Sequence, residues 1–282
     1  MWDFEHRRSY CLITVLMQDD PPSHRDAPMK TLNPRQQELL TQVQHDGFAS
    51  VETLAKHFGV THQTIRRDIN HLSELQLLRR FHGGAGLPSS IENFAYNTRQ
   101  TLFHDEKRRI AQLAAQHIPH HSSLFINLGT TTEEVAKALG QHKDLRVITN
   151  NLNVAAVMCA NPDCEVIVAG GMVRSRDLGV IGESTIDFIR QFKVDFAVIG
   201  ISGIEMDGTL RDFDYREVRV AEAIIAQSRQ VFLVADHSKF GRQALVRLAH
   251  LSQITALFTD RPVPAEMRDM LAEAKTAVYV AE

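Results

Sequence analysis

The sequence predicts an α/β protein in two parts, an N-terminal winged helix-turn-helix and a larger C-terminal α/β domain with a Rossmann-like parallel sheet. The first part is indicated by two short helical patterns that flank Gly59 and by a basic strand that ends at Gly83-Gly84. The second is indicated by short apolar runs that alternate with amphipathic stretches beyond residue 105, a pattern typical of a parallel sheet covered on both faces. A chain of 282 residues, 44% of them hydrophobic, can form one small and one medium-sized core.

The first 28 residues fit neither part. Arg7-Arg8 followed by the apolar run Tyr10–Met17 has the order of a secretion signal, yet the run is short and no small-residue cleavage site follows it. The same run is too short to span a bilayer. Because Met29 leads directly into the first predicted helix, we expect translation to start there and residues 1–28 to be a start-site artefact or a disordered leader.

A helix-turn-helix is predicted by the residues that begin and end two successive helices. Ser50 can cap a helix over Val51–Phe58, and Gly59 can adopt the left-handed conformation that closes it. Thr61 can cap the second helix, whose apolar residues recur at three- and four-residue intervals and face inward. These apolar residues are Ile65, Ile69, Leu72 and Leu75.

The outward side chains of the second helix suit a DNA major groove. Glutamine can pair with adenine, arginine with guanine or phosphate, and threonine can contact a thymine methyl group. Paired arginines are also common on an ordinary solvated helix face, so Arg66 and Arg67 alone leave both interpretations open. The order of helices, turn and strand favours binding of double-stranded DNA.

A wing is predicted directly after these helices. Leu77–His82 has the pattern of a short strand, and Gly83-Gly84 can form a tight turn beside which basic side chains would lie against phosphates. An upstream helix over Arg35–Gln44, which starts after Asn33-Pro34, completes a DNA-binding domain at residues 29–88. The candidate DNA contacts are Thr61, His62, Gln63, Thr64, Arg66, Arg67, Arg79, Arg80 and His82.

The charge of the chain excludes a broadly basic nucleic-acid binder. The formal net charge is −3, and Val60–His82 holds four arginines against Asp68 and Glu74. The basic surface must therefore be local, and affinity must depend on dimeric docking and groove contacts as well as on phosphate attraction.

Cysteine and histidine positions indicate neither a disulfide framework nor a metal site. Cys159 and Cys164 lack CxxC spacing, and Cys11 lies in the doubtful leader. Pro119 interrupts the histidines of His117–His121, which have no recognised ligand pattern. We expect a reduced cytoplasmic protein with no metal, no cofactor and no membrane partner.

The C-terminal part is expected at residues 105–282, after an irregular linker at 89–104. Its first helix is Asp105–His117, acidic at the start. The predicted strands are Leu124–Asn127, Leu145–Thr149, Glu165–Ala169, Asp195–Ile199 and Gln230–Ala235. The predicted helices are Glu133–Leu139, Val154–Ala160, Ser184–Phe192, Tyr215–Gln227 and Ala265–Glu273. Ligands of such sheets bind beyond the carboxyl ends of the strands.

A phosphate site is predicted where Gly129-Thr130-Thr131-Thr132 joins the strand Leu124–Asn127 to the next helix. Glycine allows close backbone approach, the hydroxyls can donate, and a helix N-terminus favours an anion. Lys239, also after a strand end, could supply a cation. The alternative is a capped turn without a ligand.

Further polar residues follow other strand ends. Asn150 and Asn151 could bond ligand hydroxyls, or merely form a turn. Asp212, Asp214 and Glu217 could accept hydrogen bonds from polyol hydroxyls, or be solvated charges at a helix start.

Residues Pro34–Pro88, especially Thr61–Asp68 and His82–Gly84, resemble the winged helix of the DeoR-type bacterial repressors. Five further segments resemble the effector domain of that family: Leu128–Thr132, Thr149–Asn153, Ala169–Gly171, Ile199–Gly203 and Asp236–Gly241. The resemblance implies a homodimer or homotetramer that binds an inverted-repeat operator and is released by a sugar or polyol phosphate. Leu87–Ser90 and Asp212–Glu217 resemble the members that control glycerol-3-phosphate metabolism, which implies glycerol-3-phosphate as the effector.

The C-terminal domain also resembles the ribose-5-phosphate isomerase fold, at the threonine loop and at Asp236–Lys239. A sugar-phosphate isomerase is therefore the main alternative. The isomerases carry a catalytic lysine and a run of glycines that Ile204–Tyr215 lacks, although Glu217 remains where an acid could act. A regulator that responds to another sugar phosphate, an activator and a structural nucleoid protein also remain open.

Overall fold

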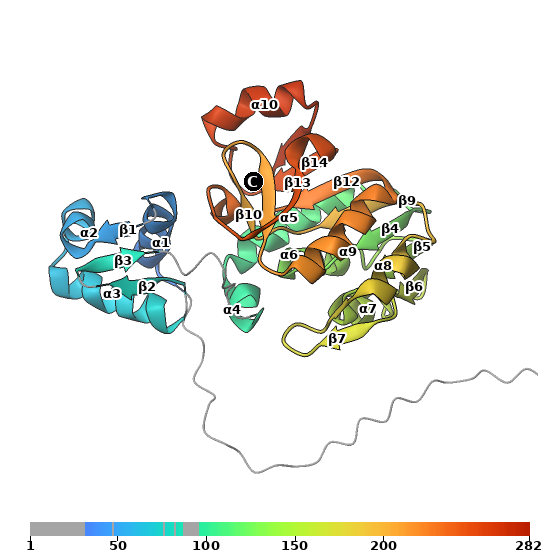
Figure 1. Cartoon of the computed structure of the whole chain (residues 1–282), viewed down its shortest axis with the longest axis horizontal. Coiled ribbons are helices and arrows are strands. Elements are labelled where there is room, and N and C mark those ends of the chain that lie inside the picture. The colour runs from blue at the N-terminus through green and yellow to red at the C-terminus, as the bar shows by residue number, and fades with distance from the viewer. Residues whose placement is uncertain (1–31, 47, 76, 82, 87–95) are drawn as a thin grey trace, which may run out of the picture. The chain divides into compact units, whose positions relative to one another are not determined.

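The computed structural model describes residues 32–46, 48–75, 77–81, 83–86 and 96–282 (Figure 1). The predictions for the leader at residues 1–28 and for His82 lie outside these residues. No helix in the described part of the chain is long and apolar enough to cross a membrane.

The N-terminal part contains the predicted helix-turn-helix and wing. Its elements are α1 (Pro34–Asp46), β1 (Phe48–Ser50), α2 (Val51–Phe58), α3 (His62–Glu74), β2 (Arg79–Phe81) and β3 (Gly84–Gly86). The strand β1 was not predicted. It pairs antiparallel with β3, so the wing is a three-stranded sheet in the order β1-β3-β2.

Local hydrogen bonds fix the ends of the two central helices as the sequence predicts. The amide of Thr53 donates to Ser50 Oγ at 3.0 Å, and that of Thr64 donates to Thr61 Oγ1 at 3.2 Å. Gly59 closes α2 with φ = 62°, a conformation that costs glycine little. Fully buried apolar side chains then hold the three helices together, among them Leu39, Leu40, Leu54, Ile65 and Leu72.

A seven-stranded parallel sheet forms the centre of the C-terminal part, in the order β15-β14-β12-β9-β4-β5-β6. The strands are β4 (Ser123–Ile126), β5 (Leu145–Thr149), β6 (Cys164–Val168), β9 (Val194–Ile199), β12 (Ser228–Val234), β14 (Ala256–Thr259) and β15 (Ala277–Val280). The five predicted strands are confirmed within one or two residues. Two further strands, β14 and β15, extend one edge beyond the predicted pattern.

Helices cover both faces of this sheet, as predicted for a parallel sheet. They are α5 (His104–Gln116), α6 (Thr130–Ala138), α7 (Leu152–Met158), α8 (Glu183–Ile189), α9 (Tyr215–Ala226) and α10 (Arg268–Glu273). One buried cluster joins α5, α6 and α7 to the sheet through residues such as Ile110 and Val135. A second joins α8, α9 and α10 to it through residues such as Ile186, Val220 and Leu271.

Short elements that the sequence analysis did not predict surround the carboxyl end of the sheet. They are the helix α4 (Tyr96–Thr101), the hairpin β7 (Met172–Arg174) and β8 (Gly179–Ile181), the antiparallel sheet β10 (Gly203–Ile204), β11 (Thr209–Asp212) and β13 (Val246–His250), and the 3₁₀ turn η1 (His237–Lys239). The expectation that the linker at residues 89–104 is irregular was wrong for α4. A helix of six residues has too few turns to show an apolar periodicity.

Candidate functional site

The exposed face of α3 carries the side chains that the sequence assigned to base contacts. His62, Gln63, Arg66 and Arg67 are exposed, while Ile65 on the opposite face is fully buried. Thr61 caps α3 as predicted, and its hydroxyl lies 3.0 Å from that of Thr64. Both threonines therefore hold the start of α3, and their contacts with DNA bases stay a prediction.

A groove separates α3 from the wing. It is lined by Val51, Gln63, Arg66, Ile69, Asn70, Arg80, Gly83 and Gly84. Arg79 and Arg80 are exposed on β2, and Arg80 Nη1 donates to Asn70 Oδ1 of α3 at 3.1 Å. This bond orients one wing arginine toward the exposed side of the helix, so α3 and β2 present one basic surface.

Asp68 does not weaken that basic surface. Its carboxylate is buried and accepts hydrogen bonds from Arg35 Nε at 2.7 Å and from Gln36 Nε2 at 3.0 Å, both on α1. In the net charge of Val60–His82 counted from the sequence, Asp68 cancels one of the arginines of α3 and β2. Since Arg35 neutralises Asp68, the positive charge that faces solvent is larger than that count.

The second candidate site is a pocket at the carboxyl end of the parallel sheet. Its lining residues are Arg99, Leu128, Gly129, Thr130, Thr131, Gly200, Ile201, Ser202, Asp212, Glu217, Val234 and Lys239. Among these are six of the ten residues predicted from sequence, namely Gly129, Thr130, Thr131, Asp212, Glu217 and Lys239. Loops after β4, β9 and β12 therefore meet here, at the carboxyl ends of the strands, where ligands of parallel sheets bind. We call this the strand-end rule.

The N-terminus of α6 opens on this pocket. Gly129 has φ = 145° and no side chain caps the helix, so first-turn amides are available to an anion. Thr132, in contrast, is fully buried, and its hydroxyl lies 2.7 Å from the carbonyl oxygens of both Asn127 and Gly129. Thr132 thus holds the loop and is not among the lining residues.

Lys239 supplies a buried cation at the same place. Its ammonium group lies 3.7 Å from Asp236 Oδ2, and its side chain is only 14% exposed. Burial lowers the pKa of Lys239, and the attraction of Asp236 opposes this effect. Burial also lowers the pKa of Lys107 of α5 to about 7, and the attraction of Asp236 again opposes this effect. Asp236 thus attracts two lysines, of which Lys239 lines the pocket.

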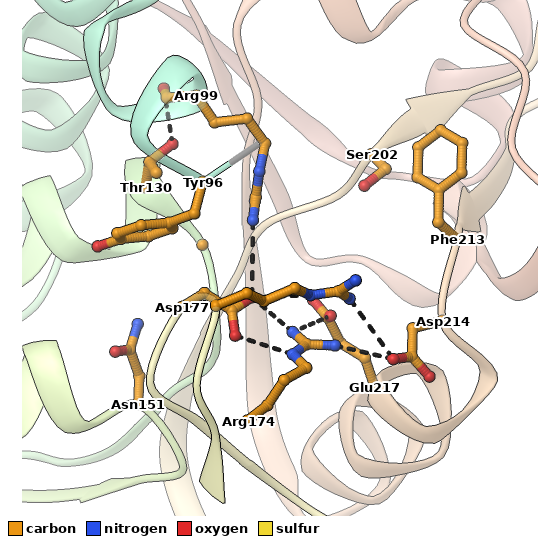
Figure 2. Close-up of polar contacts among 12 residues, drawn as sticks. Tyr96, Arg99, Thr130, Asn151, Arg174, Asp177, Ser202, Phe213, Asp214 and Glu217 are labelled. Carbon is orange, nitrogen blue, oxygen red and sulfur yellow. Dashed lines mark hydrogen bonds and ion pairs between the residues drawn. The ribbon is translucent and has the colours of Figure 1, made fainter. Parts of the chain in front are cut away.

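Three carboxylates converge on Arg174 of β7 (Figure 2). The guanidinium donates to Asp177 at 2.6 Å, to Asp214 at 2.9 Å and to Glu217 at 2.7 Å. Asp214 also caps α9. Burial and the neighbouring Asp212 raise the pKa of Glu217 to about 7, although Arg174 opposes this. Arg174 therefore holds these carboxylates in place, and they are not merely solvated charges.

The two predicted asparagines lie deeper than expected. Asn150 Nδ2 donates to the carbonyl oxygen of Val180 at 3.1 Å. Asn151 caps α7, and its Nδ2 donates to Glu133 Oε1 at 3.1 Å. Only Asn151 of the two lines the small cavity that adjoins the pocket, together with Tyr96, Arg99, Leu128, Gly129, Glu133, Asp177 and Glu217. The side chain of Asn150 therefore joins the end of β5 to β8, and its contact with a ligand stays a prediction.

Sequence reasoning missed several lining residues. Ser202 follows the end of β9 as Gly129 follows the end of β4, so the strand-end rule could have found it. Its hydroxyl donates to Asp212 Oδ1 at 2.9 Å. Tyr96 and Arg99 of α4 gave no such signal, because they precede the sheet and lie in the predicted linker. Among the described residues, no group of three or more His, Cys, Asp or Glu side chains could hold a metal ion.

Comparison with known proteins gives a match for each part of the chain. The DeoR-like helix-turn-helix domain matches residues 35–91, and the DeoR C terminal sensor domain matches residues 102–261. The glycerol-3-phosphate regulon repressor of Escherichia coli (strain K12) is 50% identical over 235 residues, 83% of this chain and 93% of the relative. The repressor of that name from Haemophilus influenzae is 50% identical over 246 residues, 87% of this chain and 96% of the relative.

The solved structures that match part of this chain include ribose 5-phosphate isomerase from Plasmodium falciparum. It has a TM-score of 0.36 and 12% identity, and the match covers 48% of this chain and 52% of the isomerase.

Proposed function

Since this chain belongs to the DeoR family of helix-turn-helix transcriptional repressors, we propose that it represses genes of glycerol-3-phosphate metabolism and leaves its operator when glycerol-3-phosphate binds. The observation that carries the effector part is the anion pocket formed by Gly129, Thr130, Thr131 and Lys239. We assign DNA binding to residues 29–88 and effector binding to residues 105–282, to which α4 adds Tyr96 and Arg99.

The DNA-binding part of the proposal is supported by the groove between α3 and the wing. Gln63 and Arg66 line it and can reach base edges. Arg80 also lines it, Arg67 and Arg79 are exposed on α3 and β2, and these three arginines suit phosphates. We propose that two or four chains present paired α3 helices to an inverted repeat. The half-sites would then be separated by about 34 Å or a multiple of it.

The effector part is supported by the charges of the pocket. A phosphate at the start of α6 would gain the helix dipole, free amides and the ammonium of Lys239. The carboxylates around Arg174, with the adjoining Asn151, offer acceptors and donors to a short polyol. Glycerol-3-phosphate has few hydroxyls, so we expect the phosphate contacts to dominate its affinity.

Release from DNA requires that the effector prefer a conformation with low DNA affinity. To shift operator occupancy from 99% to 1%, the effector must bind the low-affinity conformation more tightly than the DNA-binding one by about 5.5 kcal/mol in total. The effector sites of an oligomer can each contribute part of this free energy. The family assignment decides against the isomerase alternative: the chain is a repressor and not an enzyme.

The test is fluorescence anisotropy of the Met29–Glu282 protein on its own upstream intergenic DNA, with titration of glycerol-3-phosphate and of other sugar phosphates. Release by glycerol-3-phosphate alone would support both parts of the proposal. Release by a different phosphate would leave the repressor function and replace the effector. Absence of sequence-specific binding would contradict the assignment of α3.

A further inference from the structure

Arg99 enters the effector pocket from outside the C-terminal sheet. It belongs to α4, and only residues 87–95 separate this helix from the wing strand β3 in the sequence. Its side chain nevertheless lines the pocket beside Thr130 and Lys239. Figure 2 shows it directed toward Asp177 and the cluster around Arg174. One residue of the connecting segment is therefore part of the ligand site.

The charge of Arg99 is only loosely paired. Its Nη2 lies 3.6 Å from Asp177 Oδ2, which is too far for a hydrogen bond. Asp177 already accepts two hydrogen bonds from Arg174, at 2.8 Å and 2.6 Å. The Nε of Arg99 is buried and has no hydrogen-bond partner within the described ranges. A buried donor without an acceptor is costly, so an anion in the pocket would be a better partner than Asp177.

The main chain of Arg99 is also attached to the phosphate loop. Thr130 Oγ1 donates to the carbonyl oxygen of Arg99 at 3.3 Å, and Lys107 Nζ donates to the same oxygen. A hydroxyl has one proton to donate. If a phosphate oxygen accepts the proton of Thr130, the bond from Thr130 to Arg99 is lost. Phosphate binding thus competes for the ion pair of Arg99 with Asp177 and for the bond from Thr130, while the bond from Lys107 remains.

We propose that Arg99 binds the phosphate of the effector and transmits its presence to the DNA-binding domain. The anion draws the guanidinium from Asp177 and takes the hydroxyl of Thr130, so α4 changes its attachment to the pocket. Because only nine residues of sequence, 87–95, join the wing strand β3 to α4, a change at α4 is passed toward the DNA-binding domain along the chain itself. The inference rests on the proposed function of the pocket.

The first test compares Arg99→Gln with Lys239→Ala, since both remove a cation from the same pocket. Calorimetry would measure glycerol-3-phosphate affinity, and anisotropy would measure operator release at saturating effector. We expect Kd to rise about tenfold or more in both variants. Saturated Lys239→Ala should still release the operator, whereas Arg99→Gln should remain bound. Full release of saturated Arg99→Gln would overturn the proposal.

The second test uses the unaltered protein and needs no variant to fold. Hydrogen exchange of backbone amides in α4 would be compared without and with glycerol-3-phosphate. We expect the exchange rate of Tyr96–Thr101 to change about threefold or more, while that of α10 stays constant. Protection of α6 with no change in α4 would overturn the role of Arg99. No change in either helix would contradict the effector pocket itself.

Discussion

Lys239 is the side chain that we propose as the cation for the effector's phosphate. It lies at the end of η1, where Asp236 holds the ammonium group close to the start of α6. We expect Lys239→Ala to raise the Kd of glycerol-3-phosphate about 10- to 100-fold, because a charge-assisted hydrogen bond is lost. Isothermal titration calorimetry would measure this. The exposed Lys143→Ala is the control, and equal Kd values for the two variants would refute the role of Lys239.

Lys107 makes stability depend on pH. Its pKa is lowered from 10.5 to about 7, mainly by burial. Between these values the unfolded chain binds more protons than the folded one, so the free energy of unfolding rises with pH through this window. Below pH 7 the buried charge has its full cost.

We therefore expect Lys107→Met to stabilise the protein at pH 6.5 by up to a few kcal/mol, less the lost hydrogen bond to Arg99. The gain should shrink as pH rises toward 10. Urea denaturation at pH 6.5 and 9.5 would measure it, with the exposed Lys137→Met as control. A gain that is the same at both pH values would show that Lys107 keeps its ordinary pKa.

At the scale of elements, the small antiparallel sheet β10-β11-β13 supports one wall of the pocket. Gly203 of β10 lies so close to Arg242 that a Cβ atom would overlap the carbonyl oxygen of Arg242. The next residue before it, Ser202, lines the pocket and donates to Asp212 of β11. The strand must therefore approach Arg242 closely for Ser202 to reach its position.

We expect Gly203→Ala to destabilise the protein by about 2–4 kcal/mol, since backbone must move to relieve the overlap. Effector affinity should fall with it, because Ser202 shifts. Thermal unfolding with and without glycerol-3-phosphate would measure both effects. Gly170→Ala is the matched control, as no atom lies within 4 Å of its added Cβ. Equal melting temperatures for the two variants would contradict this account of β10.

At the scale of the whole molecule, an acidic protein must bind an acidic polymer. The net charge is −3, yet α3 and β2 carry exposed arginines and Asp68 is neutralised by Arg35. We expect operator affinity to fall steeply with salt, since each phosphate contact releases counterions.

Arg67→Gln should lower the slope of log K against log[salt] by about 0.9 if Arg67 contacts one phosphate. The weakening should be similar for operator and unrelated DNA. Anisotropy at several salt concentrations would measure the slope, with the exposed Arg190→Gln of the C-terminal part as control. An unchanged slope would place Arg67 away from the backbone of DNA.

Elements that depend on neighbouring residues could be predicted from the order of the amino acids. Ser50 and Thr61 begin the two helices of the helix-turn-helix, and Gly59 ends the first. Their hydrogen bonds join residues only three or four positions apart, so the pattern is visible in the sequence. The same holds for the loop at Gly129, which follows a buried strand and begins a helix.

The residues that complete the pocket from distant parts of the chain could be identified only in the folded protein. Arg99 reaches Thr130 across 31 positions, and Arg174 reaches Asp214 across 40. No periodicity records such pairs, because they depend on the contact of α4 with α6 and on the hairpin of β7 and β8. Burial, which no local pattern records, also gives Thr132 and Asn150 backbone partners, since the hydroxyl of Thr132 bonds the carbonyl oxygen of Asn127 and Asn150 Nδ2 donates to that of Val180. Their contacts with a ligand stay predictions.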